Sequence, residues 1–181
     1  MDNQPISKKP VPSAKSLLVI DSVNQWVRRL GELISWVYAL LILTIVLQVI
    51  LRKGFASGLI ILEELQWHLY AIGFMFGMAY AQVQDSHIRV DLFYQRFSKK
   101  TQHLIEIFGL LLLVMPFITI VFLHSLDFVE DSWRINESSP APAGLPYRWL
   151  IKSIIPTAFL LLAITVLARI YRELLLLVRS Q

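Results

Sequence analysis

The sequence predicts an all-α membrane protein with four transmembrane helices, additional interfacial amphipathic helices and both termini in the cytoplasm. Apolar residues make up 56% of the 181 residues and charged residues only 17%, and the mean hydropathy is +0.59. A soluble domain of ordinary composition carries about a quarter charged residues. The apolar residues here are gathered in four long blocks, with the basic residues mainly at one side of them. The length is that of a single domain.

The chain begins with a polar, proline-containing stretch. Residues 1–15 are predicted to form a disordered cytoplasmic tail, which leaves residues 16–181 as a single membrane domain. A secretory signal peptide is not predicted, because the first long apolar block begins only near Leu33 and lacks a small-residue cleavage site. That block should therefore remain in the protein as a membrane span.

The segment Leu17–Leu30 lies between the tail and this block. Its apolar residues recur near the helical period, with Asp21, Arg28 and Arg29 among them. Such a helix is expected to lie on the cytoplasmic face of the membrane with Trp26 at headgroup level. Its role is either that of an ordinary membrane-surface helix or that of an arm that grips a partner protein.

Four apolar blocks are long enough to cross a bilayer, which takes about 20 predominantly apolar residues in a helix. All four are rich in Leu, Ile, Val and Phe, and none repeats another closely enough to indicate an internal duplication. The predicted spans are approximately residues 33–51, 65–83, 105–126 and 150–168.

The distribution of Lys and Arg predicts the orientation of these spans. Twelve of the 17 lie at the two chain ends or between the second and third spans, and five lie in the other two connections. Since cytoplasmic loops carry the excess of basic residues, both termini should be cytoplasmic. On that side, residues 90–97 predict a second interfacial helix. On the other side, the acidic and proline-rich residues 127–147 predict an ordered turn that a soluble partner could meet.

Several kinds of chemistry are not expected from this sequence. It contains no cysteine, which excludes disulfides, thiolate metal sites and cysteine nucleophiles. The centres of the predicted spans are almost free of charge and show no paired broken helices, so a solute or ion path within this chain alone is not expected. Neither catalytic residues nor a cofactor is predicted. The sequence pI near 9.5 indicates contact with anionic lipid headgroups rather than with nucleic acid.

Small residues form a face on each of the first two spans. Gly73, Gly77 and Ala81 are spaced by four, as are the small residues at the start of the first span. Such faces allow helices to approach closely. They serve either packing within the four-helix bundle or docking onto another membrane subunit.

Two groups of ionisable residues are candidates for structural interactions. His87 and Asp91 are four residues apart and would share one face of a helix at the cytoplasmic interface, which suits anchoring better than catalysis. Arg52 follows the first span, and Glu63 and Glu64 precede the second. The short connection between them predicts an ion pair across the turn.

The four histidines raise a second hypothesis, that of a haem-binding membrane anchor of a redox complex. His68 and His124 are predicted near the outer side, and His87 and His103 near the inner side, of the second and third spans. A b-type cytochrome places paired histidines from facing helices on the haem iron. A strong Soret band in the purified protein would support this alternative.

The stretch from Arg52 to Arg96 resembles the small, DctQ-type membrane subunit of tripartite ATP-independent periplasmic (TRAP) transporters. An arginine closes the first span, Glu-Glu-Leu and a tryptophan open the second, glycines follow, and His-Ile-x-Val-Asp stands at its inner end. The matching residues are Arg52, Glu63, Glu64, Leu65, Trp67, Gly73, Gly77, His87, Ile88, Val90 and Asp91. The turn into the fourth span, with Glu137, Ser138, Pro146, Trp149 and Pro156, also resembles the family.

The resemblance implies a division of labour in a bacterial inner membrane. A large membrane subunit would move the solute, usually an organic acid, by an ion-coupled elevator mechanism, and a periplasmic binding protein would deliver it. This chain would be a non-enzymatic scaffold with no solute-binding residues of its own. The expected subunit-interface or structural residues are Arg52, Glu63, Glu64, Trp67, Gly73, Gly77, His87 and Asp91.

Overall fold

The computed structural model describes residues 14–84 and 97–179, and every element in these two ranges is helical. The helices are α1 (Ala14–Gly54), α2 (Ile60–Val83), α4 (Lys99–Gly109), the π-helical turn η1 (Leu110–Val114), α5 (Met115–Arg134), α6 (Arg148–Lys152) and α7 (Ile154–Arg179). The all-α prediction is confirmed. Of the predicted tail, Ala14 and Lys15 already belong to α1, and residues 1–13 lie outside the described ranges.

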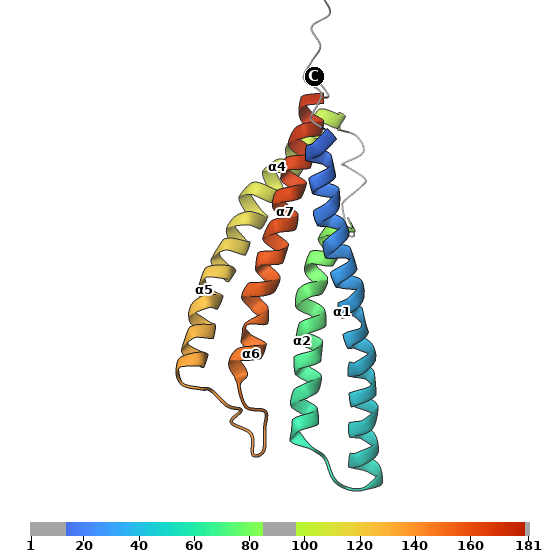
Figure 1. Ribbon diagram of the computed structural model, residues 1–181, viewed down its shortest axis with the longest axis vertical. Coiled ribbons are helices and arrows are strands. Elements are labelled where there is room, and N and C mark those ends of the chain that lie inside the picture. Colours follow the sequence, from blue (N-terminus) through green and yellow to red (C-terminus); the bar gives the residue numbers. More distant parts are fainter. Residues whose placement is uncertain (1–13, 85–96, 180–181) are drawn as a thin grey trace, which may run out of the picture.

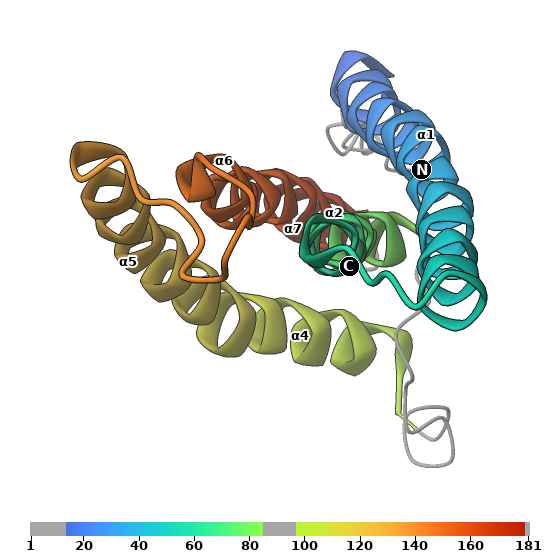
Figure 2. The ribbon, with the colours of Figure 1, turned by 90° about the horizontal axis from the view of Figure 1, so that it is seen from below.

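The helices run up and down an elongated bundle (Figure 1). The start of α1 and the end of α7 lie at one end, here called the termini end. The α1–α2 connection and the segment between α5 and α6 lie at the opposite end, here called the loop end. The helices come together at the termini end and diverge toward the loop end, with α5 and α1 on the two outer sides (Figures 1 and 2).

Three of the described helical runs are long and apolar enough to cross a membrane: Leu18–Gly54, Lys99–Arg134 and Arg148–Val178. They contain the first, third and fourth predicted spans. The second predicted span, residues 65–83, lies within α2, which is not among the three. Gln66, His68 and Gln82 interrupt the apolar sequence of α2.

The predicted interfacial helix at residues 17–30 is not a separate element, because α1 continues from Ala14 to Gly54 without a break. The apolar face of this segment packs within the protein. Ile20 and Val27 are buried, and Val27 belongs to a core cluster with Ala79 of α2 and Leu161 of α7. Part of the apolar face thus packs against two neighbouring helices, whereas Trp26 is 57% exposed. The second predicted interfacial segment, residues 90–97, lies outside the described residues except for Phe97.

Helix α7 is the centre of the bundle and contacts α1, α2, α4 and α5. Its other core cluster joins Phe159, Val166 and Ile170 to Leu110 of η1 and Ile118 of α5. The π turn directly precedes Pro116 in the first turn of α5, where the missing proline N–H leaves a carbonyl of the preceding turn without its usual donor.

Most of the apolar surface lies outside these cores. In the most apolar 18-residue windows of the three long runs, only 11%, 11% and 28% of the residues are buried inside the protein. Exposure on this scale is far greater than the scattered apolar residues of a soluble surface. The helices therefore require lipid or another protein around them.

Candidate functional site

A cluster of polar side chains at the loop end is centred on Glu64. Its carboxylate accepts hydrogen bonds from the Ser139 hydroxyl and, at 2.5 Å, from the Leu145 backbone N–H. Ser139 also accepts a bond from the Ala141 N–H at 3.2 Å. The backbone must come close here, since a Cβ on Gly144 would lie 2.5 Å from the Ser139 side chain and 2.9 Å from Glu64. Glu64 thus binds α2 to the α5–α6 segment.

The predicted ordered turn is a strained one. Asn136, Ala143 and Tyr147 all have left-handed backbone conformations, with φ of 49°, 60° and 59°. Non-glycine residues adopt such angles only where the surrounding structure holds them. The bonds to Glu64 are the interactions that hold this segment against α2.

A second carboxylate anchors the same segment to the last helices. Glu137 forms an ion pair with Lys152 and lies 3.6 Å from the Arg148 guanidinium. The Lys152 ammonium also lies 3.8 Å from the centre of the Phe128 ring, within the range of a cation–π interaction. Trp133 and Trp149 pack edge to face beside this group, with ring centres 4.4 Å apart. We call Glu64, Glu137, Ser139, Leu145, Arg148 and Lys152 the loop-end cluster.

Hydrogen bonding lowers the pKa of both carboxyl groups below the ordinary value of 4.5. For Glu64 the largest cause is the Leu145 N–H and the next is the Ser139 hydroxyl. For Glu137 the largest cause is the hydrogen bond from Lys152. Both groups are therefore ionised at neutral pH, and their bonds are charge-assisted, which makes them stronger than bonds between neutral groups.

The predicted ion pair between Arg52 and the Glu63–Glu64 carboxylates is wrong. Glu64 turns toward the α5–α6 segment, and Glu63 accepts a bond from the Gln48 amide at 3.3 Å. The Gln48 oxygen in turn accepts the Leu59 N–H at 3.4 Å, so an uncharged amide closes the turn. Within the described residues Arg52 forms no ion pair with either carboxylate. Its exposed position leaves it free to remain in water, which avoids the cost of desolvation.

The predicted small-residue faces meet between α1 and α2. A Cβ on Gly73 would lie 2.5 Å from the Tyr38 ring, and one on Gly31 would lie 2.3 Å from the Tyr80 ring. Gly77 has open space around its Cβ position. These residues line a mainly apolar groove of about 270 Å³. Two of the glycines thus serve packing within the bundle.

Trp67 belongs to neither feature. Trp67 follows Glu64 on α2, but its side chain is 73% exposed, so it lies on the outer surface of the bundle. His87 and Asp91 lie outside the described residues. Among the predicted site residues that the structure describes, Glu64 joins the loop-end cluster and the two glycines line the α1–α2 groove.

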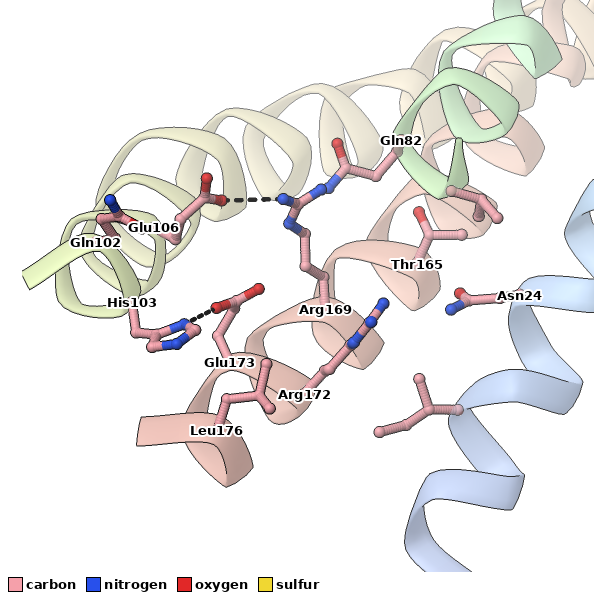
Figure 3. A pocket seen from close by; sticks show the side chains of 12 residues that line it. Asn24, Gln82, Gln102, His103, Glu106, Thr165, Arg169, Arg172, Glu173 and Leu176 are labelled. Carbon is pink, nitrogen blue, oxygen red and sulfur yellow. Dashed lines mark hydrogen bonds and ion pairs between the residues drawn. The ribbon is translucent and has the colours of Figure 1, made fainter. Parts of the chain in front are cut away.

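The termini end holds two ion pairs that sequence reasoning missed. Glu106 of α4 pairs with Arg169 of α7 at 3.1 Å, and His103 of α4 pairs with Glu173 of α7 at 2.5 Å (Figure 3). All four side chains are largely buried. The position of Glu106 in the sequence could have predicted its ion pair. It lies inside the predicted third span, and a carboxylate in a membrane helix requires a partner.

The arrangement does not support the haem hypothesis. His68 lies on α2 and His124 on α5, and α7 lies between these two helices (Figure 2). His124 is exposed and its Nδ1 lies 2.9 Å from the Ile120 carbonyl of its own helix. His103 is engaged by Glu173.

Comparison with known protein families gives a match over most of the chain. A family model described as "Tripartite ATP-independent periplasmic transporters, DctQ component" matches residues 41–176, which is well over half of the chain. The loop-end cluster, the two ion pairs of the termini end and all eight predicted site residues lie within this range. No curated protein matches the chain. The chain therefore belongs to the DctQ family and is the small membrane subunit of a TRAP transporter.

Proposed function

We propose that this subunit is a four-span scaffold for the large membrane subunit in ion-coupled uptake of an organic acid. In this proposal the chain lies in the bacterial inner membrane with its termini end in the cytoplasm. The large subunit and a periplasmic solute-binding protein are its partners. The exposed apolar surface of the helices is the observation that carries the proposal.

This surface includes a regular stripe along α1. Its large apolar side chains are separated by three or four residues, as on one side of a helix that packs against another helix. All are between 43% and 74% exposed: Leu33, Trp36, Leu40, Leu43, Leu47 and Ile50. A broad contact with lipid or protein suits a fixed scaffold, whereas a solute path would require polar side chains along the span.

The loop-end cluster supports a second part of the proposal. In the proposed orientation it faces the periplasm, where the binding protein delivers its solute. The ion pairs and hydrogen bonds of Glu64 and Glu137 hold this segment in one conformation. A surface that is already ordered loses less entropy when a partner binds. We therefore assign the segment 136–147 a role in receiving the binding protein.

The test is co-purification from membranes in which the three proteins are produced together. The tagged chain should retain a large polytopic membrane protein, identified by mass spectrometry, and uptake of a labelled carboxylic acid should require the chain. Recovery of this chain without the large subunit in mild detergent, together with unchanged uptake in its absence, would contradict the proposal. A Soret band in the same sample would instead revive the haem alternative.

A matched pair of variants locates the contact. The first variant truncates three side chains of the α1 stripe: Leu40→Ala, Leu43→Ala and Leu47→Ala. The second truncates three exposed side chains of α5: Phe117→Ala, Ile120→Ala and Leu123→Ala. If α1 is the docking face, only the first set reduces the retained large subunit. Equal retention by both sets would exclude the α1 stripe as the contact.

A further inference from the structure

A polar cavity of about 290 Å³ lies at the termini end, between α1, α2, α4 and α7. Figure 3 shows the side chains around it, which come from all four helices. Its walls combine charged groups with amides and apolar residues. The proposed scaffold function does not require this cavity.

The two carboxylates in the cavity wall already have side-chain partners. Glu106 pairs with Arg169 at 3.1 Å, and Glu173 pairs with His103 at 2.5 Å. These pairs join α4 to α7 and leave neither carboxylate without a partner.

The other polar residues of the wall include two donors that suit an anion, Gln82 and Arg172. The Gln82 side chain is only 7% exposed, and its amide nitrogen has no hydrogen-bond partner in the part of the chain that the structure describes. An unsatisfied buried donor is destabilising, so an acceptor in the cavity would stabilise the protein. Arg172 lines the same cavity from α7 and is exposed, with no ion pair among the described residues. An amide and a guanidinium both donate to anionic oxygens.

Ile20, Val83 and Leu176, from three different helices, add apolar surface to the wall beside the polar Asn24, Gln102 and Thr165. A ligand that joins an anionic oxygen group to an apolar body matches such a wall. Basic pockets between membrane helices on the cytoplasmic side bind phospholipid headgroups. We propose that this cavity binds a phosphate group through Arg172 and Gln82, supplied either by a phospholipid headgroup or by free inorganic phosphate.

The experiment uses the full chain purified in detergent and depleted of lipid. Native mass spectrometry measures how much phosphatidylglycerol and how much phosphatidylcholine is retained when each is added back. In parallel, ³¹P line broadening measures binding of inorganic phosphate. The variants are Arg172→Gln, which removes the charge, and Gln82→Met, which keeps the volume but removes the amide. Lys100→Gln is the matched control, since it removes one charge from an exposed position of α4 that does not line the cavity.

We expect Arg172→Gln to weaken binding about tenfold and Gln82→Met to weaken it about fivefold, as for loss of a charge-assisted and a neutral hydrogen bond. Lys100→Gln should bind as the parent chain does. Arg172→Lys should recover part of the affinity, because the ammonium keeps the charge but not the planar fork. Arg172 is exposed, so its variants should fold even if Gln82→Met does not.

The two arms distinguish the sources of the phosphate. Variant-sensitive retention of phosphatidylglycerol identifies a lipid headgroup, and variant-sensitive broadening of the inorganic phosphate signal identifies free phosphate. No binding in either arm would overturn the proposal. So would an equal loss with Lys100→Gln and Arg172→Gln, because that result indicates general charge attraction rather than a site.

Discussion

The Glu64 carboxylate accepts a hydrogen bond from the Ser139 hydroxyl, 75 residues further along the chain. With the bond from the Leu145 N–H, it connects α2 to the segment between α5 and α6. Glu64 lies at the start of α2, outside the predicted second span, where its charge need not enter the hydrocarbon. The family resemblance predicts a structural role for Glu64, and the structure identifies its hydrogen-bond partners.

Glu64→Gln should loosen the α5–α6 segment, because a neutral amide accepts weaker hydrogen bonds than a carboxylate. The variant should melt a few degrees lower in detergent, and trypsin should cut it faster after Arg134 and Arg148, which flank the segment. Glu63→Gln is the control, since Glu63 bonds only to the Gln48 amide among the described residues. Equal changes in both variants would show that Glu64 has no special part in holding the segment.

The loop-end cluster should lose stability in acid. Glu64 and Glu137 have a lower pKa in the folded protein than the ordinary 4.5. Their stabilisation is therefore complete at pH values above 4.5 and is lost as the pH falls through the folded pKa. The melting temperature should be constant near neutral pH and fall below about pH 4.5. A Glu64→Gln and Glu137→Gln double variant should start lower and fall less steeply, and an unchanged slope would refute this account.

The glycines of the α1–α2 groove should differ in their tolerance of alanine. A Cβ on Gly31 meets the base of the Tyr80 side chain, including its Cβ at 2.9 Å, which can move only with the helix backbone. A Cβ on Gly73 meets the tip of the Tyr38 ring, which can rotate away. Gly31→Ala should therefore cost about 1–3 kcal/mol of stability and Gly73→Ala less.

Gly77→Ala is the internal control of this series, because nothing lies within 4 Å of its Cβ position. It should be neutral or slightly stabilising, since alanine favours the helix over glycine. Melting curves of the three variants in one detergent give the order directly. An equal change in all three would show that contact with the tyrosines does not determine the effect.

The Glu106–Arg169 pair should couple α4 to α7. Both side chains are 15% exposed, so removing one partner leaves a largely buried charge. Glu106→Gln and Arg169→Gln should each destabilise the protein by about 3–5 kcal/mol, and the double variant by less than the sum. A double-mutant cycle on thermal or denaturant unfolding measures the difference. Strict additivity would mean that the two groups do not interact in the folded protein.

The proposed four-span topology can be tested with single cysteines, because the chain has none of its own. Ser57 lies in the exposed α1–α2 connection, and Lys100 lies on the exposed first turn of α4. If α2 spans the membrane, an impermeant maleimide labels Ser57→Cys in cells with a permeable outer membrane. Lys100→Cys should react only after the inner membrane is opened. Labelling of both under the first condition would show that α2 does not cross.

The apolar blocks and the glycine spacing allowed much of the fold to be predicted. Helix formation and helix length depend on neighbours within a few residues, so the predicted spans 33–51, 105–126 and 150–168 lie inside long apolar helical runs. Gly31 and Gly73 pack at a helix contact as their spacing indicates. The resemblance to DctQ subunits agrees with the family match over residues 41–176.

The predictions that were wrong concern residues whose local sequence pattern is compatible with more than one packing or bonding partner. The periodicity of residues 17–30 describes an apolar face, but not whether that face meets lipid or helices α2 and α7. The charges of Arg52, Glu63 and Glu64 are near one another in sequence, yet Gln48 and the α5–α6 segment provide the partners. The sequence does not indicate which backbone N–H group will donate to a distant side chain, as that of Leu145 does to Glu64.

The sequence by itself determined the class of the protein, the position of its apolar helices and its family, because hydropathy, helical period and short motifs are properties of contiguous residues. Only the tertiary structure decided that Glu64 binds Ser139, that Glu106 meets Arg169, and that a polar cavity forms beside Gln82. These contacts join residues far apart in the chain. They depend on how α7 packs among its neighbours, and that packing places each charge next to the group that satisfies it.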